Sequence, residues 1–194
     1  MRNLALSALL ILLLVACAGG NKNVEVAKPA TPNINLDSAG MAETIHTFYK
    51  WYGEAGKQLI TKINFVNTEA KHPRLDLGIL GKYLGEFAKS GAICTEFIQN
   101  ETVFYRACGL AWAEQKSGDI LTGFEVDRYY CQQDADPAEF LTAGTSYKMD
   151  GEYAIVQLML DPKGPNGGPR DFEMKKQNGR WLLSKYICNA AYTH

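Results

Sequence analysis

The residues best equipped for chemistry lie between Asp127 and Asp134. This stretch holds two carboxylates, two tyrosines, two glutamines and Cys131. Two carboxylates that share a pocket can separate their pKa values and work as a general acid and a general base. One interpretation is therefore an enzyme of the isomerase or dehydratase type that uses Asp127 or Asp134 as its base.

The alternative interpretation of the same stretch is structural. Aspartate side chains at turns commonly accept hydrogen bonds from nearby backbone N–H groups. Gln133 and Asp134 would then bond the backbone where a strand ends before Pro137, and Asp127 would cap a turn or pair with Arg128 or a nearby lysine. We favour this interpretation, so the sequence predicts no catalytic residue.

Aromatic side chains extend the set of candidate binding residues. Tyrosine and tryptophan can line a ligand pocket or anchor a protein interface, although at helical and strand spacings they also suit a core. The sequence-based candidates for binding are Asp127, Tyr129, Gln133, Asp134, Trp51 and Tyr52.

Metal and cofactor motifs are missing from the sequence. The histidines His46, His72 and His194 are not at ligand spacing, and neither a Cys-x-x-Cys pair nor a Gly-x-Ser-x-Gly elbow occurs. We therefore expect no metal and no cofactor, and hydrolase and metalloenzyme functions are disfavoured.

The N-terminus has the pattern of an export signal. Arg2 precedes the uncharged apolar run 4–16, and a short apolar run after a cation is typical of a secretory signal peptide. As a helix the run would span about 20 Å, too short for the ~30 Å hydrocarbon core of a membrane. We expect residues 1–16 to be removed.

Leu14-Val15-Ala16-Cys17 resembles the lipobox of bacterial lipoproteins. The resemblance implies acylation of Cys17, and three acyl chains would anchor the mature chain stably to a membrane. Ala18, in place of the aspartate that retains enterobacterial lipoproteins in the inner membrane, implies the outer membrane with the domain facing the periplasm. The alternative is a non-acylated signal peptide with an incidental cysteine.

The other four cysteines are Cys94, Cys108, Cys131 and Cys188. An even number in an exported chain predicts two disulfides, for which three pairings are possible. We favour Cys94 with Cys108 and Cys131 with Cys188. The first pair requires a break in the intervening helical region, expected at Asn100, because a continuous helix would hold the two thiols about 20 Å apart.

Length and charge set the domain organisation. A chain of 194 residues suits one domain, and a net charge of −1 lacks the basic field needed for nucleic acid. Residues 18–38 are rich in small, polar and proline residues, as flexible tethers are. We expect a signal peptide at 1–16, a lipidated tether at 17–40 and a single domain at 41–194.

The front half of the domain has a helical period. Met41, Ile45, Phe48 and Tyr52 recur at spacings of four, three and four, which predicts a helix from Asp37 or Ser38 to about Gly53 or Gly56. Further helices are expected at about 75–88 and 92–115.

The back half has a strand period. Strands are expected at 153–160, 172–175 and 180–187, because Asp150-Gly151 and Asn178-Gly179 are type I′ hairpin signals. Helices followed by an antiparallel meander of three or four strands predict an α+β fold, with N-terminal helices packed on a curved antiparallel sheet. The Gly- and Pro-rich segment 161–169 is expected to protrude as a mobile hairpin tip.

Three segments together resemble an uncharacterised family of bacterial lipoproteins in the nuclear-transport-factor-2-like superfamily. They are Phe48-Tyr49-Lys50-Trp51-Tyr52, the segment 127–134 and Asn178-Gly179-Arg180-Trp181-Leu182-Leu183. The resemblance covers roughly residues 42–188 and implies a cone-like fold with a cavity between sheet and helices. It implies no activity, since that superfamily includes enzymes, binders and inhibitors.

These features predict a non-catalytic envelope lipoprotein that binds a protein partner in the periplasm, of the kind that inhibits an envelope-acting toxin. One rival is a binder of a small apolar ligand in the cone cavity. The other is the isomerase-like or dehydratase-like enzyme. A deep aromatic pocket with a buried carboxylate would favour the rivals, and a filled interior with an exposed apolar patch would favour protein binding.

Overall fold

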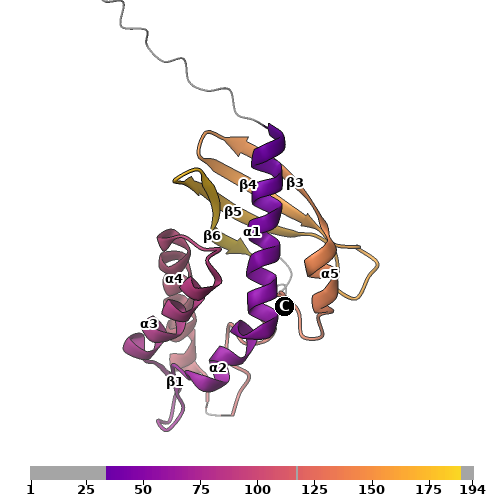
Figure 1. Ribbon diagram of the computed structural model, residues 1–194. Helices are drawn as coiled ribbons and strands as arrows, with labels where there is room; N and C mark the ends of the chain where they lie inside the picture. The colour runs from indigo at the N-terminus through magenta and orange to yellow at the C-terminus, as the bar shows by residue number, and fades with distance from the viewer. Residues whose placement is uncertain (1–33, 117, 189–194) are drawn as a thin grey trace, which may run out of the picture. The chain divides into compact units, whose positions relative to one another are not determined.

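The computed structural model describes residues 34–116 and 118–188 (Figure 1). The chain separates into two units, Met1–Thr31 and Pro32–His194, and every described residue belongs to the second. The expected signal peptide, the lipidation site Cys17 and the tether up to residue 33 lie outside the described residues. Among the described helices, none has the length and apolarity to cross a membrane.

Helix α1, Ile34–Glu54, carries the predicted apolar stripe, and all four of its residues are buried. The helix begins earlier than expected, so residues 34–40, assigned to the tether, are helical. A tertiary contact explains the earlier start of the helix. Asp37 is buried and accepts a hydrogen bond from the indole Nε1 of Trp181 at 2.8 Å.

The predicted helix at 75–88 is α3, Leu77–Glu86. The Asp76 carboxylate caps it by accepting from the Ile79 N–H at 2.9 Å, and a 3-10 turn, Phe87–Ser90, ends it at Gly91 with a φ of 65°. The shorter elements are η1 Gly56–Gln58, α2 Leu59–Lys62, β1 Val66–Asn67, β2 Arg74–Leu75, η3 Trp112–Glu114 and α5 Pro137–Thr142.

Helix α4, Thr95–Ala111, is continuous, so the break predicted at Asn100 is wrong. Asn100 stays within the helix, and its Nδ2 donates to the carbonyl of Ser184 at 2.9 Å. The unbroken helix separates Cys94 and Cys108 by about 20 Å, and both are free and buried. Their predicted disulfide is therefore wrong, whereas the disulfide between Cys131 and Cys188 is present.

The α+β prediction is confirmed by a four-stranded antiparallel sheet in the order β3-β4-β5-β6. Its strands are β3 Gly144–Asp150, β4 Tyr153–Met159, β5 Arg170–Gln177 and β6 Arg180–Ile187. The segment before α4 closes the β6 edge, because the Leu183 N–H donates to the Ala92 carbonyl at 2.8 Å and the Cys94 N–H donates to the Leu183 carbonyl at 3.0 Å.

The two hairpin turns that the sequence predicts differ. Asn178 and Gly179 have φ values of 51° and 78°, as the predicted type I′ turn requires. In the other hairpin the loop residues are Gly151 and Glu152, one position later than expected. Gly151 has a positive φ of 61°, and Glu152 does not have a positive φ. This combination is that of a type II′ turn.

Aromatic rings fill the space between α1 and the sheet. Figure 1 shows α1 lying across one face of the sheet with α5 beside it. Tyr49 of α1 is 4.6 Å from Phe140 of α5 and 6.2 Å from Phe172 of β5, measured between ring centroids. Tyr186 of β6 lies 5.3 Å from Phe172 and 6.0 Å from Tyr129. These rings and the buried β4 residues Ala154, Val156 and Leu158 form one core.

The segment 161–169 is anchored through its two buried residues, Asn166 and Gly168, although most of the segment is exposed, and it is not the free tip that its glycines and prolines suggest. Asn166 is fully buried, and the guanidinium of buried Arg170 holds the segment through backbone carbonyls. Arg170 Nη1 donates to Gly168 at 2.6 Å, Nη2 donates to Asn166, and Nε donates to Tyr130 at 3.2 Å. Arg170 and the Asn166 side chain, which bonds Gln132, Asp136 and Glu139, thus fix a loop whose own residues form no helix or strand.

Candidate functional site

The segment from Asp127 onward forms a tight turn with structural hydrogen bonds. The Cys131 N–H donates to the Asp127 carbonyl at 2.7 Å, and Asp127 Oδ1 accepts from the N–H groups of Tyr129 and Tyr130, each at 3.0 Å. Gln133 Nε2 donates to the Glu125 carbonyl at 2.9 Å. These are the side-chain-to-backbone bonds that the structural interpretation predicts for Asp127 and Gln133. Its prediction for Asp134 is wrong, because the Asp134 side chain is exposed and forms no hydrogen bond with the described residues.

Three of the six candidate binding residues meet in the interior. The Tyr52 hydroxyl donates to the Asp127 carboxylate at 3.0 Å, and the Tyr52 and Tyr129 ring centroids are 5.0 Å apart. Trp51 packs against Phe87 at 5.1 Å and lies 6.5 Å from Tyr52, both measured between ring centroids. Gln133 and Asp134 lie on an exposed loop, and none of the six lines the pockets described below.

Arg128 pairs with Glu101. Of the roles predicted for Asp127, a turn cap or a pair with Arg128 or a lysine, the structure therefore shows the cap. The Arg128 Nη2 lies 2.8 Å from Glu101 Oε1, and the Tyr129 hydroxyl donates to Glu101 Oε2 at 2.9 Å. The guanidinium also stacks 3.8 Å from the Phe104 ring centroid. Burial and the Glu101 charge raise the pKa of Tyr129 well above its ordinary value. The neutral hydroxyl is therefore kept as a hydrogen-bond donor.

Glu101 was missed by sequence reasoning, although a signal existed. It lies four residues after Phe97 and four before Tyr105, on the stripe that α4 buries. A charged residue at a core position predicts a buried partner. In the part of the chain that the structure describes, no group of three or more His, Cys, Asp or Glu side chains is arranged to hold a metal.

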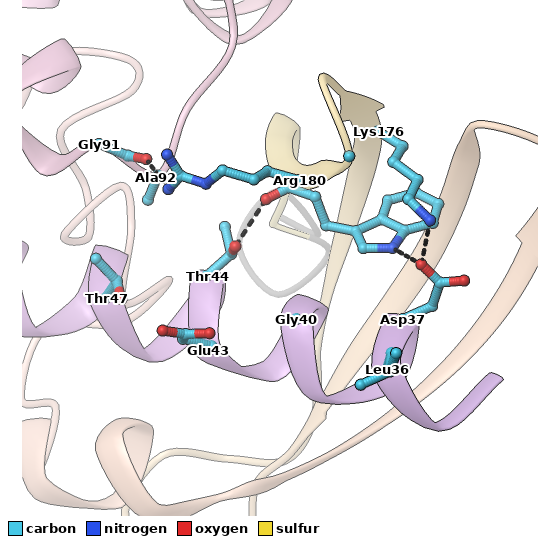
Figure 2. A pocket seen from close by; sticks show the side chains of 12 residues that line it. Leu36, Asp37, Gly40, Glu43, Thr44, Thr47, Gly91, Ala92, Lys176 and Arg180 are labelled. Carbon is cyan, nitrogen blue, oxygen red and sulfur yellow. Dashed lines mark hydrogen bonds and ion pairs between the residues drawn. The ribbon is translucent and has the colours of Figure 1, made fainter. Parts of the chain in front are cut away.

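A polar pocket of 420 Å³ lies between the start of α1 and the β5–β6 hairpin (Figure 2). Asp37 accepts from the Trp181 indole and forms an ion pair with Lys176, which together lower the pKa of Asp37. Figure 2 also shows the Thr44 hydroxyl donating to the Trp181 carbonyl, and Arg180 reaching the Gly91 carbonyl. Most of these polar groups bond one another, and these bonds hold the start of α1 against the β5–β6 hairpin.

A second pocket of 590 Å³ is apolar and lies between the 72–77 segment and α4. We call it the α4 groove, defined by the residues that line it: His72, Pro73, Arg74, Leu75, Leu77, Arg106, Gly109, Leu110 and Ala113. A Cβ at Gly109 would come within 3.0 Å of the Leu75 Cβ. The missing side chain therefore lets β2 approach α4 closely. At the other end of the groove, the ring Nδ1 of His72 lies 2.9 Å from the Gln115 carbonyl oxygen. This contact joins the start of the 72–77 segment to the residues that follow α4.

The α4 groove continues along the outer face of the helix. Leu110 is 79% exposed, Val103 is 67% exposed and Leu77 is 50% exposed. Val103, Ala107 and Leu110 follow one another at spacings of four and three, so they share one side of α4. The sequence contained a signal for this exposed surface. Apolar residues lie on the buried stripe of α4 and also on a second side of the helix, so two sides of the helix need an apolar partner.

Comparisons of the chain with models of protein families, with curated proteins and with solved structures find no match. The resemblance to lipoproteins of the nuclear-transport-factor-2-like superfamily therefore stays a prediction. The α+β class, the filled aromatic interior and the exposed α4 groove rest on the structure of this chain.

Proposed function

We propose that the protein is a non-catalytic lipoprotein of the bacterial cell envelope, anchored through Cys17, whose domain binds a protein partner at the α4 groove. Inhibition of an envelope-acting toxin is one form that such binding would take. The observation that carries the proposal is the exposure of Leu77 and Leu110, which line the α4 groove, and of Val103, which lies on the same side of α4 as Leu110. Contiguous exposed apolar surface marks interaction sites in soluble domains.

The interior supports binding over catalysis. Oδ1 and Oδ2 of Asp127 already accept from the Tyr52 hydroxyl, and Oδ1 also accepts from two backbone N–H groups. A general base needs an open path to the proton that it removes. Tightly packed rings occupy the region where a cone cavity for an apolar ligand would lie.

The proposal is tested by comparing three tagged full-length proteins in the cells that make this chain. They are the wild type, Leu110→Asp in the α4 groove, and Ile155→Asp, whose side chain is exposed on β4. We expect the same partner to co-purify with the wild type and with Ile155→Asp, and to be absent with Leu110→Asp. A thermal melt checks that both variants are folded.

Two results would contradict the proposal. Identical sets of co-purified proteins from all three chains would show that the α4 groove is not the docking surface. Turnover of a small substrate that is abolished by Asp127→Asn in a folded protein would establish the enzyme instead.

A further inference from the structure

We infer that the segment occupying the α4 groove is an amphipathic helix with carboxylates beside its apolar face. This inference deepens the proposed function and rests on it, since it names the chemistry of the partner that the groove accepts. It depends on three properties of the groove: the sign of its charges, the spacing of its apolar residues and the absence of a long strand edge beside it.

The charges of the α4 groove have one sign. Arg74 and Arg106 line it, no lining residue is acidic, and neither guanidinium has an ion-pair partner among residues 34–116 and 118–188. The nearest acid in sequence, Asp76, caps α3 through the Ile79 N–H. Carboxylates on a docked segment would therefore find two cations, whereas a basic segment would be repelled.

The apolar residues suit a helix as the occupant. Val103 and Leu110 are two turns apart on α4, which places them about 10 Å apart along its axis. Ala107 and Ala113 are small, so a second helix can approach to the 8–10 Å that helix pairs adopt. Its own apolar residues would then recur at i, i+3 or i+4, and i+7.

Strand addition is a poorer fit. The only strands beside the groove within the described residues are β1 and β2, which have two residues each and already pair with one another. A segment added there would gain few main-chain hydrogen bonds, because affinity in that mode comes from a long unpaired edge.

The test is a selection from a library of random peptides of about 16 residues, long enough for four helical turns. The full-length protein is used as wild type, as Leu110→Asp, and as the double variant Arg74→Glu and Arg106→Glu. Lys148→Glu, an exposed change on β3, is a control for charge reversal outside the groove. A thermal melt first establishes that each variant is folded.

We expect wild type and Lys148→Glu to enrich peptides with apolar residues at helical spacing and flanking Asp or Glu. Their affinity should fall about tenfold or more with the double variant, and it should weaken as salt rises. The double variant itself should enrich peptides with Lys or Arg, and Leu110→Asp should lose all of these peptides.

The outcomes separate this inference from the proposed function. Peptides that need Leu110 but carry no excess of acids, or that alternate with a period of two, would overturn the helix or its charge and leave the groove as a docking surface. No Leu110-dependent peptide at all would overturn both. Sedimentation that shows a Leu110-dependent dimer would make a second copy of the chain the occupant and overturn the inference.

Discussion

Tyr129 and Tyr130 are neighbours in sequence, but their hydroxyl groups differ in hydrogen bonding. Both are fully buried, but the Tyr129 hydroxyl donates to Glu101 Oε2, whereas the Tyr130 hydroxyl has no hydrogen-bond partner among the described residues. Burial raises the pKa of Tyr130 to about 12. The two hydroxyls therefore stay protonated, and only one of them contributes a bond to the folded state.

This contrast predicts different effects for the same substitution. Tyr129→Phe leaves the buried Glu101 carboxylate without one donor, and we expect a loss of about 1–3 kcal/mol in the free energy of unfolding. Tyr130→Phe removes a hydroxyl whose desolvation is not compensated, so stability should be unchanged or slightly higher. Urea denaturation of both variants measures the difference. Equal losses would mean that Tyr130 also has a partner.

The Asp127 carboxylate should matter for stability and the Asp134 carboxylate should not. Asp127→Asn weakens the bonds from Tyr52 and from the backbone N–H groups of the turn, and we expect a loss of about 1–3 kcal/mol. Asp134 is the matched control, because its side chain is exposed and forms no hydrogen bond or ion pair with the described residues. Thermal melts of the two Asn variants make the comparison. A lower melting temperature for Asp134→Asn alone would contradict the assignment.

At the scale of residues, the type of a residue predicted its contacts with neighbours in sequence better than its contacts with distant segments. Asp127 caps a turn because an aspartate bonds its own neighbouring backbone wherever the chain folds back. The alternative role, a pair with Arg128, does not occur, because Arg128 pairs with Glu101 on α4, which the tertiary structure brings near. The position of Glu101 on the buried stripe of α4 signals a buried partner, but nothing local in the sequence identifies Arg128 as that partner.

The first turns of α1 are held to the sheet by the Asp37, Lys176 and Trp181 side chains. The folded state lowers the pKa of Asp37 through the Lys176 ion pair and the Trp181 hydrogen bond. A carboxyl with a lowered pKa stabilises the fold at pH values above its unfolded pKa, about 3.9. That stabilisation is lost as the pH falls through the folded pKa.

Asp37→Asn should therefore be less stable than the wild type by about 1–3 kcal/mol at pH 7, and the gap should narrow below about pH 4. Glu43→Gln, an exposed change on the same helix, is the control and should show no such dependence. Urea denaturation at pH 7 and at pH 3.5 measures the gap. A gap that is the same at both pH values would show that the Asp37 charge does not stabilise the fold.

Among the elements, periodicity predicted those with one clear buried face. The stripe of α1 and the alternation of β4 are confirmed. Strand β3 was not located in advance, because Gly144-Thr145-Ser146-Tyr147-Lys148-Met149-Asp150 has few large apolar residues. The segment 161–169 was misjudged because its order comes from Arg170 and from carbonyls that sequence patterns do not report.

For the molecule as a whole, the fold class followed from the order of helical and strand periods, but the α4 groove did not. The groove requires the 72–77 segment to pack against α4 at Gly109, some thirty residues later in the sequence. No periodicity encodes that approach. The exposed face of α4 was readable in part from Val103 and Leu110, and only the structure shows that it continues into an apolar pocket lined by two arginines.

Maleimide labelling of the five cysteines tests the structure and the anchoring proposal in one measurement. Cys131 and Cys188 are joined, and Cys94 and Cys108 are free and buried. Burial raises the pKa of Cys108 to about 11, so little thiolate exists at neutral pH and the native protein should react slowly with a maleimide. Acylation would block Cys17.

Intact mass after maleimide labelling should therefore show two labels on unfolded, unreduced protein purified from membranes, and four after reduction. Reduction should also lower stability by roughly 4 kcal/mol, because the disulfide joins residues 57 positions apart. Three labels followed by five would show that Cys17 carries a free thiol, which would remove the lipid anchor and keep the fold. No label before reduction would mean that Cys94 and Cys108 are paired after all, which requires α4 to break between them.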